Sequence, residues 1–264
     1  MRTVRQRAGN RVPDVTVFFW ITTILAVPVG GAAADLLCDR LGLGLTLTTA
    51  ATSFALAVAL CFQFRVRRYV PALYWLVVLL VGIAGALTTD NLVDNVGVPL
   101  GAAAIVFAAA LGGTLATWYA TERTLSIRAV DSPRREAYYW FAVLFTVALG
   151  TAAGDLAADR AGLGYGLAAG VFAALIALVT VAHLLFGLGA VLAFWIAYGL
   201  TRPFGAALGD LLSQPHDQGG AALGTVVTSL ICLAAIVAIL IYLTRTGRDA
   251  PRPDAGRHPG AVAR

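Results

Sequence analysis

Long apolar stretches separated by short polar joints dominate the chain. Each stretch is continuously apolar over about 20 residues, which is the length of a membrane-crossing helix, whereas a membrane-crossing strand alternates apolar and polar positions. The stretches lie near residues 14–37, 43–64, 70–90, 96–119, 137–157, 163–185, 188–212 and 221–243. The pattern therefore predicts an all-α membrane protein with eight transmembrane helices.

The composition agrees with a membrane-embedded chain. Of 264 residues, 59% are hydrophobic and 12% charged, and the mean hydropathy is +0.81. So few polar side chains cannot cover the surface of a soluble domain. Cys38, Cys61 and Cys232 are odd in number and far apart, so we expect small buried side chains and no disulfide framework.

Arginine is distributed unevenly along the chain. All 19 basic residues are arginines, and sixteen of them fall in the N-terminal segment, the joints at 65–68 and 121–136, and the C-terminal tail. Arginine-rich joints mark the cytoplasmic side, so we predict that both termini are cytoplasmic. The same bias explains the pI of 9.4 through contact with the lipid bilayer, and we expect no nucleic-acid partner.

A three-residue signature recurs four times. A glycine follows a tryptophan by ten residues and an aspartate follows it by fifteen. The tryptophans are Trp20, Trp75, Trp140 and Trp195, the glycines are Gly30, Gly85, Gly150 and Gly205, and the aspartates are Asp35, Asp90, Asp155 and Asp210. Each copy holds two predicted helices, so all copies enter the membrane from the same side. The repeats are parallel, and equivalent residues are expected at equal depth.

The tryptophan spacings of 55, 65 and 55 residues indicate two duplicated halves. We expect the repeats at 11–68, 69–130, 131–186 and 187–244. A basic cytoplasmic segment at 1–10 precedes them, and a tail at 245–264, rich in proline, glycine and charge, follows them and is expected to be disordered.

The repeated aspartates are the candidate binding residues. A second acid stands four residues after the first in three copies, as Asp39, Asp94 and Asp159, and Gln214 takes this place in the fourth. On an α-helix such pairs share one face, and the first aspartates lie about 30 Å from the helix start, near the outer rim of the hydrocarbon layer. Two interpretations stand open. The carboxylates fasten neighbouring repeats by hydrogen bonds, or they form an acidic ring that attracts a cation.

Arg202 is the one cation deep inside a predicted helix. A buried arginine is costly unless it is paired, so an ion pair with an aspartate such as Asp210 is favoured over a selectivity barrier. For the tryptophans, anchoring in the membrane interface is favoured over an inner constriction. For the glycines, each followed four residues later by a small residue, close helix packing is favoured.

The chain lacks the motifs of the common enzymes. It has no serine elbow, no paired-histidine metal helix and no phosphate-binding loop, so we expect neither enzymatic activity nor a cofactor. We predict a small-cation transporter or channel, with oxygen ligands that suit magnesium, manganese, calcium or a proton. The alternative is a membrane scaffold that transports nothing, in which the aspartates only lock the repeats together.

The repeat resembles that of a bacterial family of integral membrane proteins, built from four tandem repeats of unknown function with a characteristic tryptophan in each. The four tryptophans carry the resemblance, together with residues 68–75 (RYVPALYW) and 150–156 (GTAAGDL). It covers residues 11–244. It implies eight membrane spans and an inner-membrane location, and it implies no activity and no catalytic residue.

Overall fold

A computed structural model describes residues 10–66, 68–161 and 164–250, and side chains at 157–161 are outside the description. Its long helices are α1 (Val17–Asp35), α2 (Gly44–Arg65), α3 (Pro71–Asp90), α4 (Leu100–Glu122), α5 (Pro133–Ala161), α6 (Tyr165–Phe186), α7 (Ala190–Ser213) and α8 (Thr225–Thr246). All eight are long and apolar enough to cross a membrane, and the described residues include no strand. The prediction of eight helices in an all-α membrane protein is confirmed.

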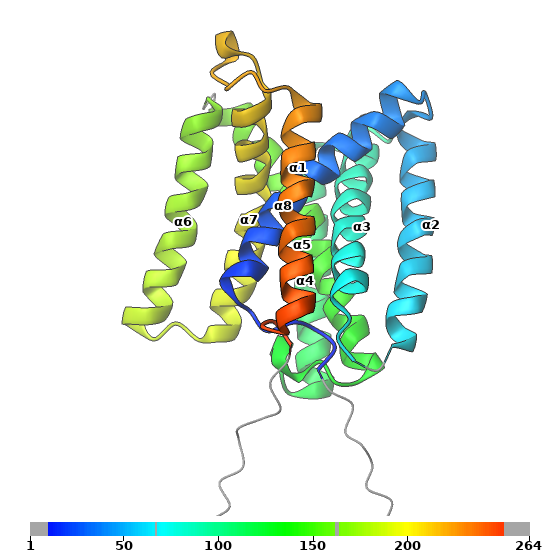
Figure 1. Cartoon of the computed structure of the whole chain (residues 1–264), viewed down its shortest axis with the longest axis vertical. Coiled ribbons are helices and arrows are strands. Elements are labelled where there is room, and N and C mark those ends of the chain that lie inside the picture. Colours follow the sequence, from blue (N-terminus) through cyan, green and yellow to red (C-terminus); the bar gives the residue numbers. More distant parts are fainter. Residues whose placement is uncertain (1–9, 67, 162–163, 251–264) are drawn as a thin grey trace, which may run out of the picture.

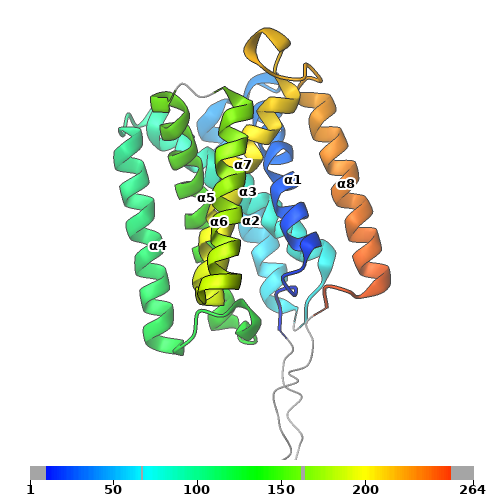
Figure 2. The same cartoon turned by 90° about the vertical axis from the view of Figure 1, so that its left-hand side faces the viewer.

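The four odd-numbered helices form a closed ring. Helix α1 packs against α3 and α7, and α5 packs against the same two helices from the other side. Figures 1 and 2 show these helices side by side at the centre of the molecule. Because the four helices come from four copies of one repeat, the ring is approximately fourfold, with its axis along the bundle.

Each even-numbered helix packs on the odd helix of the next repeat. Helix α2 lies on α3, α4 on α5, and α6 on α7, while α8 returns to α1 and closes the circle. The main packing unit is therefore not the two helices of one sequence repeat. Neighbouring repeats interlock, and the ring is complete only when the last helix meets the first.

The even helices form the outer layer of the bundle. Many of their large apolar side chains are exposed, among them Phe54 on α2, Ile105 on α4 and Leu185 on α6. In water such exposure over a whole helix face is unfavourable, whereas in lipid it is the expected state. The outer layer therefore faces the bilayer.

Both ends of the described chain lie on one face of the bundle. The backbone amide of Asp14 donates to the carbonyl of Asp249 over 3.0 Å, and that of Arg11 donates to the carbonyl of Val130 over 2.9 Å. We call this the terminal face and the opposite one, which carries the loop at 214–224, the distal face (Figure 1). All four odd helices begin at the terminal face, which confirms that the repeats are parallel.

Aromatic side chains fill the terminal half of the ring. Each tryptophan packs against the aromatic residue that immediately precedes the tryptophan of the previous repeat. The pairs are Phe19–Trp75, Tyr74–Trp140, Tyr139–Trp195 and Phe194–Trp20, with ring centroids 5.4–6.3 Å apart. We call this closed circuit the aromatic ring. The hydroxyls of Tyr74 and Tyr139 add a hydrogen bond of 2.6 Å inside it.

The aromatic ring overturns the favoured interpretation of the tryptophans as interfacial anchors. Trp75, Trp140 and Trp195 are at most 8% exposed, and Trp20 is half-buried. An anchor presents its ring to the lipid headgroups, whereas these rings close the interior. The physical reason is the interlocked packing, which turns this position of each odd helix toward the next helix instead of toward lipid.

Candidate functional site

The repeated glycines let the odd helices approach closely. A Cβ atom on Gly85 would lie 2.8 Å from Val147, one on Gly150 would lie 2.8 Å from Arg202, and one on Gly205 would lie 2.7 Å from Val27. Each of these contacted residues follows its own tryptophan by seven positions. A Cβ on Gly30, the glycine of the first repeat, would lie 3.3 Å from Ile83, which follows its tryptophan by eight positions. A side chain at these positions would therefore crowd the neighbouring odd helix.

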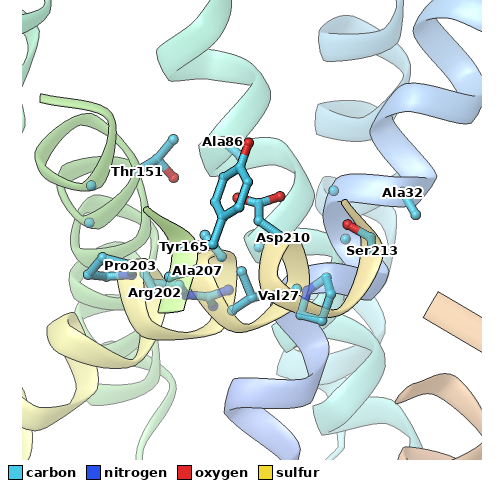
Figure 3. Close-up of a pocket in the computed structure, with 18 of the residues that line it drawn as sticks. Val27, Ala32, Ala86, Thr151, Tyr165, Arg202, Pro203, Ala207, Asp210 and Ser213 are labelled. Atoms are coloured by element: carbon cyan, nitrogen blue, oxygen red, sulfur yellow. The ribbon is translucent and has the colours of Figure 1, made fainter. Parts of the chain in front are cut away.

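A cavity of about 480 Å³ lies on the ring axis in the distal half of the bundle. Its wall consists mostly of small and apolar residues from α1, α3, α5 and α7, with contributions from α6 and α8. Figure 3 shows Arg202 and Asp210 extending from α7 toward this space, with Tyr165 beside them. We call it the axial cavity. Its volume suits a small organic molecule or a hydrated ion.

Three of the four first-position aspartates line the axial cavity. Asp35, Asp155 and Asp210 reach it from three different repeats. Asp90 lines an adjoining pocket of about 170 Å³ in which Asp155 also takes part. The parallel repeats therefore gather the four carboxyl groups at one end of the ring. Asp35 and Asp155 are exposed, so this end of the cavity is open toward the distal face.

The two second acidic positions whose side chains are described, Asp39 and Asp94, do not line the axial cavity. Asp39 lies in a π-helical segment, Leu36–Arg40, and Asp94 lies in another, Asn91–Asn95. The wider turns of these segments replace the i, i+4 geometry expected for an unbroken α-helix. Asp39 is exposed and lines neither cavity, and Asp94 reaches only the smaller pocket. The side chain of Asp159 lies outside the described residues.

Arg202 forms the floor of the axial cavity. It is 5% exposed, and its guanidinium crosses the ring from α7 to α3, where a Cβ on Gly82 would lie 3.1 Å from Nη1. Its Nε and Nη2 are buried and have no hydrogen-bond partner among the described residues. Two of its polar atoms therefore remain unpaired beside an open space.

The predicted ion pair of Arg202 is wrong for the part of the chain that the structure describes, since none of the ion pairs there includes it. Asp210 lies on the same helix but eight residues on, which is about 12 Å along the axis. The carboxylates collect at the distal mouth while the guanidinium lies at the floor. The alternative interpretation, an arginine that controls what enters, gains from this separation.

The floor closes the cavity toward the terminal face. One turn before Arg202 on α7, the side chain of Tyr198 is 1% exposed and its ring lies 5.6 Å from that of Phe194. Both belong to a large core cluster that includes the aromatic ring. The structure is therefore open at the distal end and sealed at the terminal end.

Sequence reasoning missed a buried polar cluster under this seal. Arg11 and Glu136 form an ion pair in which both side chains are at most 5% exposed, and Gln63 Nε2 donates to the other carboxylate oxygen over 2.9 Å. This cluster joins the N-terminal segment to α2 and α5. In the sequence, Glu136 stands beside arginines at the start of an apolar stretch. This pattern does not indicate which residue pairs with the glutamate.

A second contact ties the loop before α3 to the segment after α8. The hydroxyl of Tyr69 donates to Asp249 Oδ2 over 2.5 Å. Burial and this neighbouring carboxylate raise the pKa of Tyr69 above its ordinary value. We call the two contacts, Arg11–Glu136 and Tyr69–Asp249, the terminal latch.

Comparison with known proteins places the repeats in a family. The family described as Repeat of Unknown Function (DUF347) matches the chain four times in tandem, at residues 18–69, 73–124, 138–187 and 193–249. Each match covers one odd helix and the even helix that follows it. No curated protein and no solved structure matches the chain.

Proposed function

Since the chain belongs to the Repeat of Unknown Function (DUF347) family, whose description assigns no activity, we propose from the geometry of the axial cavity that this membrane protein transports small cations. The cation enters from the distal face and meets the carboxylates at the mouth. No enzymatic step belongs to the proposal.

The gathering of the repeated aspartates around one cavity carries this proposal. Asp35, Asp155 and Asp210 line it, and Asp90 lies in the adjoining pocket. Among the described side chains, neither Asp35 nor Asp90 has a hydrogen-bond or ion-pair partner, which favours transport over a scaffold in which these aspartates lock the repeats together. Carboxylates at a low-dielectric mouth concentrate cations and repel anions.

The ligand arrangement favours a hydrated or organic cation over a tightly coordinated metal. Within the described ranges, no three acidic, histidine or cysteine side chains come close enough together to hold one ion. A dehydrated metal ion requires such convergence of ligands. A hydrated ion or an ammonium compound needs only the field of the carboxylates and space, and the cavity offers both.

The arginine distribution supports an orientation for this transport. In the part of the chain that the structure describes, most of the arginines belong to segments at the terminal face, so we place this face in the cytoplasm, with the distal cavity facing the outside of a bacterial inner membrane. A structure open at one end and sealed at the other suits one state of an alternating-access cycle, in which the sealed and open ends exchange.

Flux into proteoliposomes tests the proposal. The purified protein is reconstituted, and uptake of inorganic cations and of the diamine cadaverine is followed with and without a gradient. Replacing Asp35, Asp90, Asp155 and Asp210 together with asparagine should abolish the uptake that the wild-type protein shows. Asp217→Asn is the matched control, because Asp217 is exposed on the distal loop and lines neither cavity.

Two results would contradict the proposal. Wild-type protein that adds no flux above empty vesicles for any cation tested would remove it. Equal flux in the quadruple variant and in wild type, with both proteins folded, would show that the aspartates are not the entry site.

A further inference from the structure

The floor of the axial cavity holds a charge that a simple cation site does not explain. Arg202 places a buried guanidinium at the closed end of a space whose open end carries carboxylates. A cation that passes the aspartates is repelled at the floor. The cavity is therefore bipolar, negative at its mouth and positive at its base.

The guanidinium has free hydrogen-bonding capacity on the buried side. Nε and Nη2 lack partners, and no carboxylate among the described side chains forms an ion pair with Arg202. Leaving buried donors of a charged group unsatisfied costs more than a neutral hydrogen bond gains. An anionic group in the cavity would relieve this cost, and the planar guanidinium binds a carboxylate through two parallel hydrogen bonds.

The repeat pattern shows that the arginine is an addition to the fold. The equivalent positions in the first three repeats are Val27, Gly82 and Val147. A Cβ on Gly85 would lie 2.8 Å from Cγ1 and 3.1 Å from Cβ of Val147, and one on Gly150 would lie 2.8 Å from Cβ and 3.1 Å from Cγ of Arg202, so the two residues come about equally near their glycines. A valine at position 202 would therefore satisfy the helix packing. The guanidinium beyond Cγ is not needed to hold the ring together.

We propose that the axial cavity binds a small organic ammonium compound that also carries a carboxylate, with the carboxylate on Arg202 and the ammonium group among Asp35, Asp155 and Asp210. This inference rests on the proposed function and names its substrate class. Arg202 and Asp210 stand about 12 Å apart along α7, so the ligand must hold its two charges several ångströms apart. Lysine and 5-aminovalerate do so, and α-amino acids without a side-chain amine do not.

The discriminating experiment compares pairs of compounds that differ only in the carboxylate. Lysine is paired with cadaverine, and 5-aminovalerate with pentylamine. Binding to the full chain in lipid nanodiscs is measured by calorimetry and by the shift in unfolding temperature. We expect the carboxylate-bearing member of each pair to bind at least tenfold more tightly to the wild-type protein.

Variants of Arg202 assign the preference to this side chain. In Arg202→Val the tenfold preference for the carboxylate-bearing compound should fall to about one while the amines still bind. Arg202→Lys should retain part of this preference because the positive charge remains. Arg245→Val, which removes an exposed arginine on the terminal face, should leave the ratio unchanged. If Arg202→Val fails to fold, Gly82→Ala serves instead, since its added methyl group crowds Nη1 and should lower the ratio.

The outcomes separate this inference from the proposed function. Equal binding of both members of each pair, with tighter cadaverine binding in Arg202→Val, would make Arg202 a barrier to cations. That result overturns the inference and leaves cation transport standing. Binding of neither member overturns the inference, and the inorganic-cation flux then decides the proposed function alone.

Discussion

Gly82 and Arg202 meet across the ring, and the missing side chain of the first makes room for the long side chain of the second. A Cβ on Gly82 would lie 3.1 Å from Nη1 and 3.7 Å from Nη2 of Arg202. Because the two residues occupy the same position of the second and fourth repeats, the ring departs from fourfold symmetry in a complementary way. One helix gains a charge and the helix opposite loses a side chain.

This relationship predicts a compensating pair of substitutions. Gly82→Val introduces the residue found at this position in the first and third repeats, but against Arg202 it overpacks the ring and should destabilise the protein by about 1–3 kcal/mol. Adding Arg202→Val should recover most of that loss. Thermal unfolding of both single variants and the double variant gives the coupling energy, and strictly additive effects would show that the two side chains do not meet.

The repeated glycines should be far more sensitive to substitution than their neighbours. A Cβ on Gly205 would lie 2.7 Å from Val27 and 2.9 Å from the backbone oxygen of Ile24, whereas one on Gly31 would meet nothing within 4 Å. Gly205→Ala should lower the stability by about 1–3 kcal/mol because backbone has to move. Gly31→Ala should be neutral or stabilise by about 0.5–1 kcal/mol through its higher helix propensity. Equal unfolding temperatures for the two variants would contradict the close approach of α7 and α1.

Breaking the buried ion pair of the terminal latch should be costly. Arg11→Ala leaves the fully buried Glu136 with Gln63 as its remaining side-chain partner among the described residues, and removal of one member of a buried pair costs about 3–5 kcal/mol. The control is Arg134→Ala, whose side chain is 63% exposed and lies 3.7 Å from Glu122. An exposed pair contributes less than about 1 kcal/mol. Similar unfolding temperatures for both variants would argue against a buried position of Glu136.

Tyr69 should make the stability depend on alkaline pH. Its folded-state pKa is raised by burial and by Asp249, so the folded protein holds this proton more tightly than the unfolded chain. The contribution is therefore complete below about pH 10, the ordinary tyrosine value, and decreases as the pH rises above it. Tyr69→Phe removes this contribution. Unfolding temperatures at pH 8 to 11 should fall less steeply for the variant, and parallel curves would contradict the assignment.

Much of the architecture was predictable from the sequence, because it depends on local length and on internal repetition. Twenty apolar residues in a row must form a helix in lipid, since no other conformation of a single segment satisfies the backbone there. Four signatures with equal internal spacing, each holding two spans, must share one direction. The common level of Asp35, Asp90, Asp155 and Asp210 follows from these two facts alone.

The partners of individual side chains were decided by tertiary structure. The sequence places Asp210 on the same helix as Arg202 and suggests a pair, but the guanidinium extends sideways to Gly82 on α3. The sequence also suggests that Trp75 meets lipid. In the structure each even helix packs on the odd helix of the next repeat, as α2 does on α3, and the tryptophan faces the interior. Arg11 and Glu136 are 125 residues apart, and nothing in either segment specifies the other.

The difference between what the sequence determines and what the tertiary structure decides has one physical cause. Hydrophobic length, helix periodicity and repeat spacing act within a segment or between identical segments, so the chain by itself determined eight helices in four parallel repeats and the depth of their acids. The interlocking of each even helix with the next repeat depends on contacts between unlike surfaces. Only the assembled ring decided that the aspartates surround a cavity and that the tryptophans seal it. It also decided that Arg202 forms the floor, with Nε and Nη2 unpaired among the described residues.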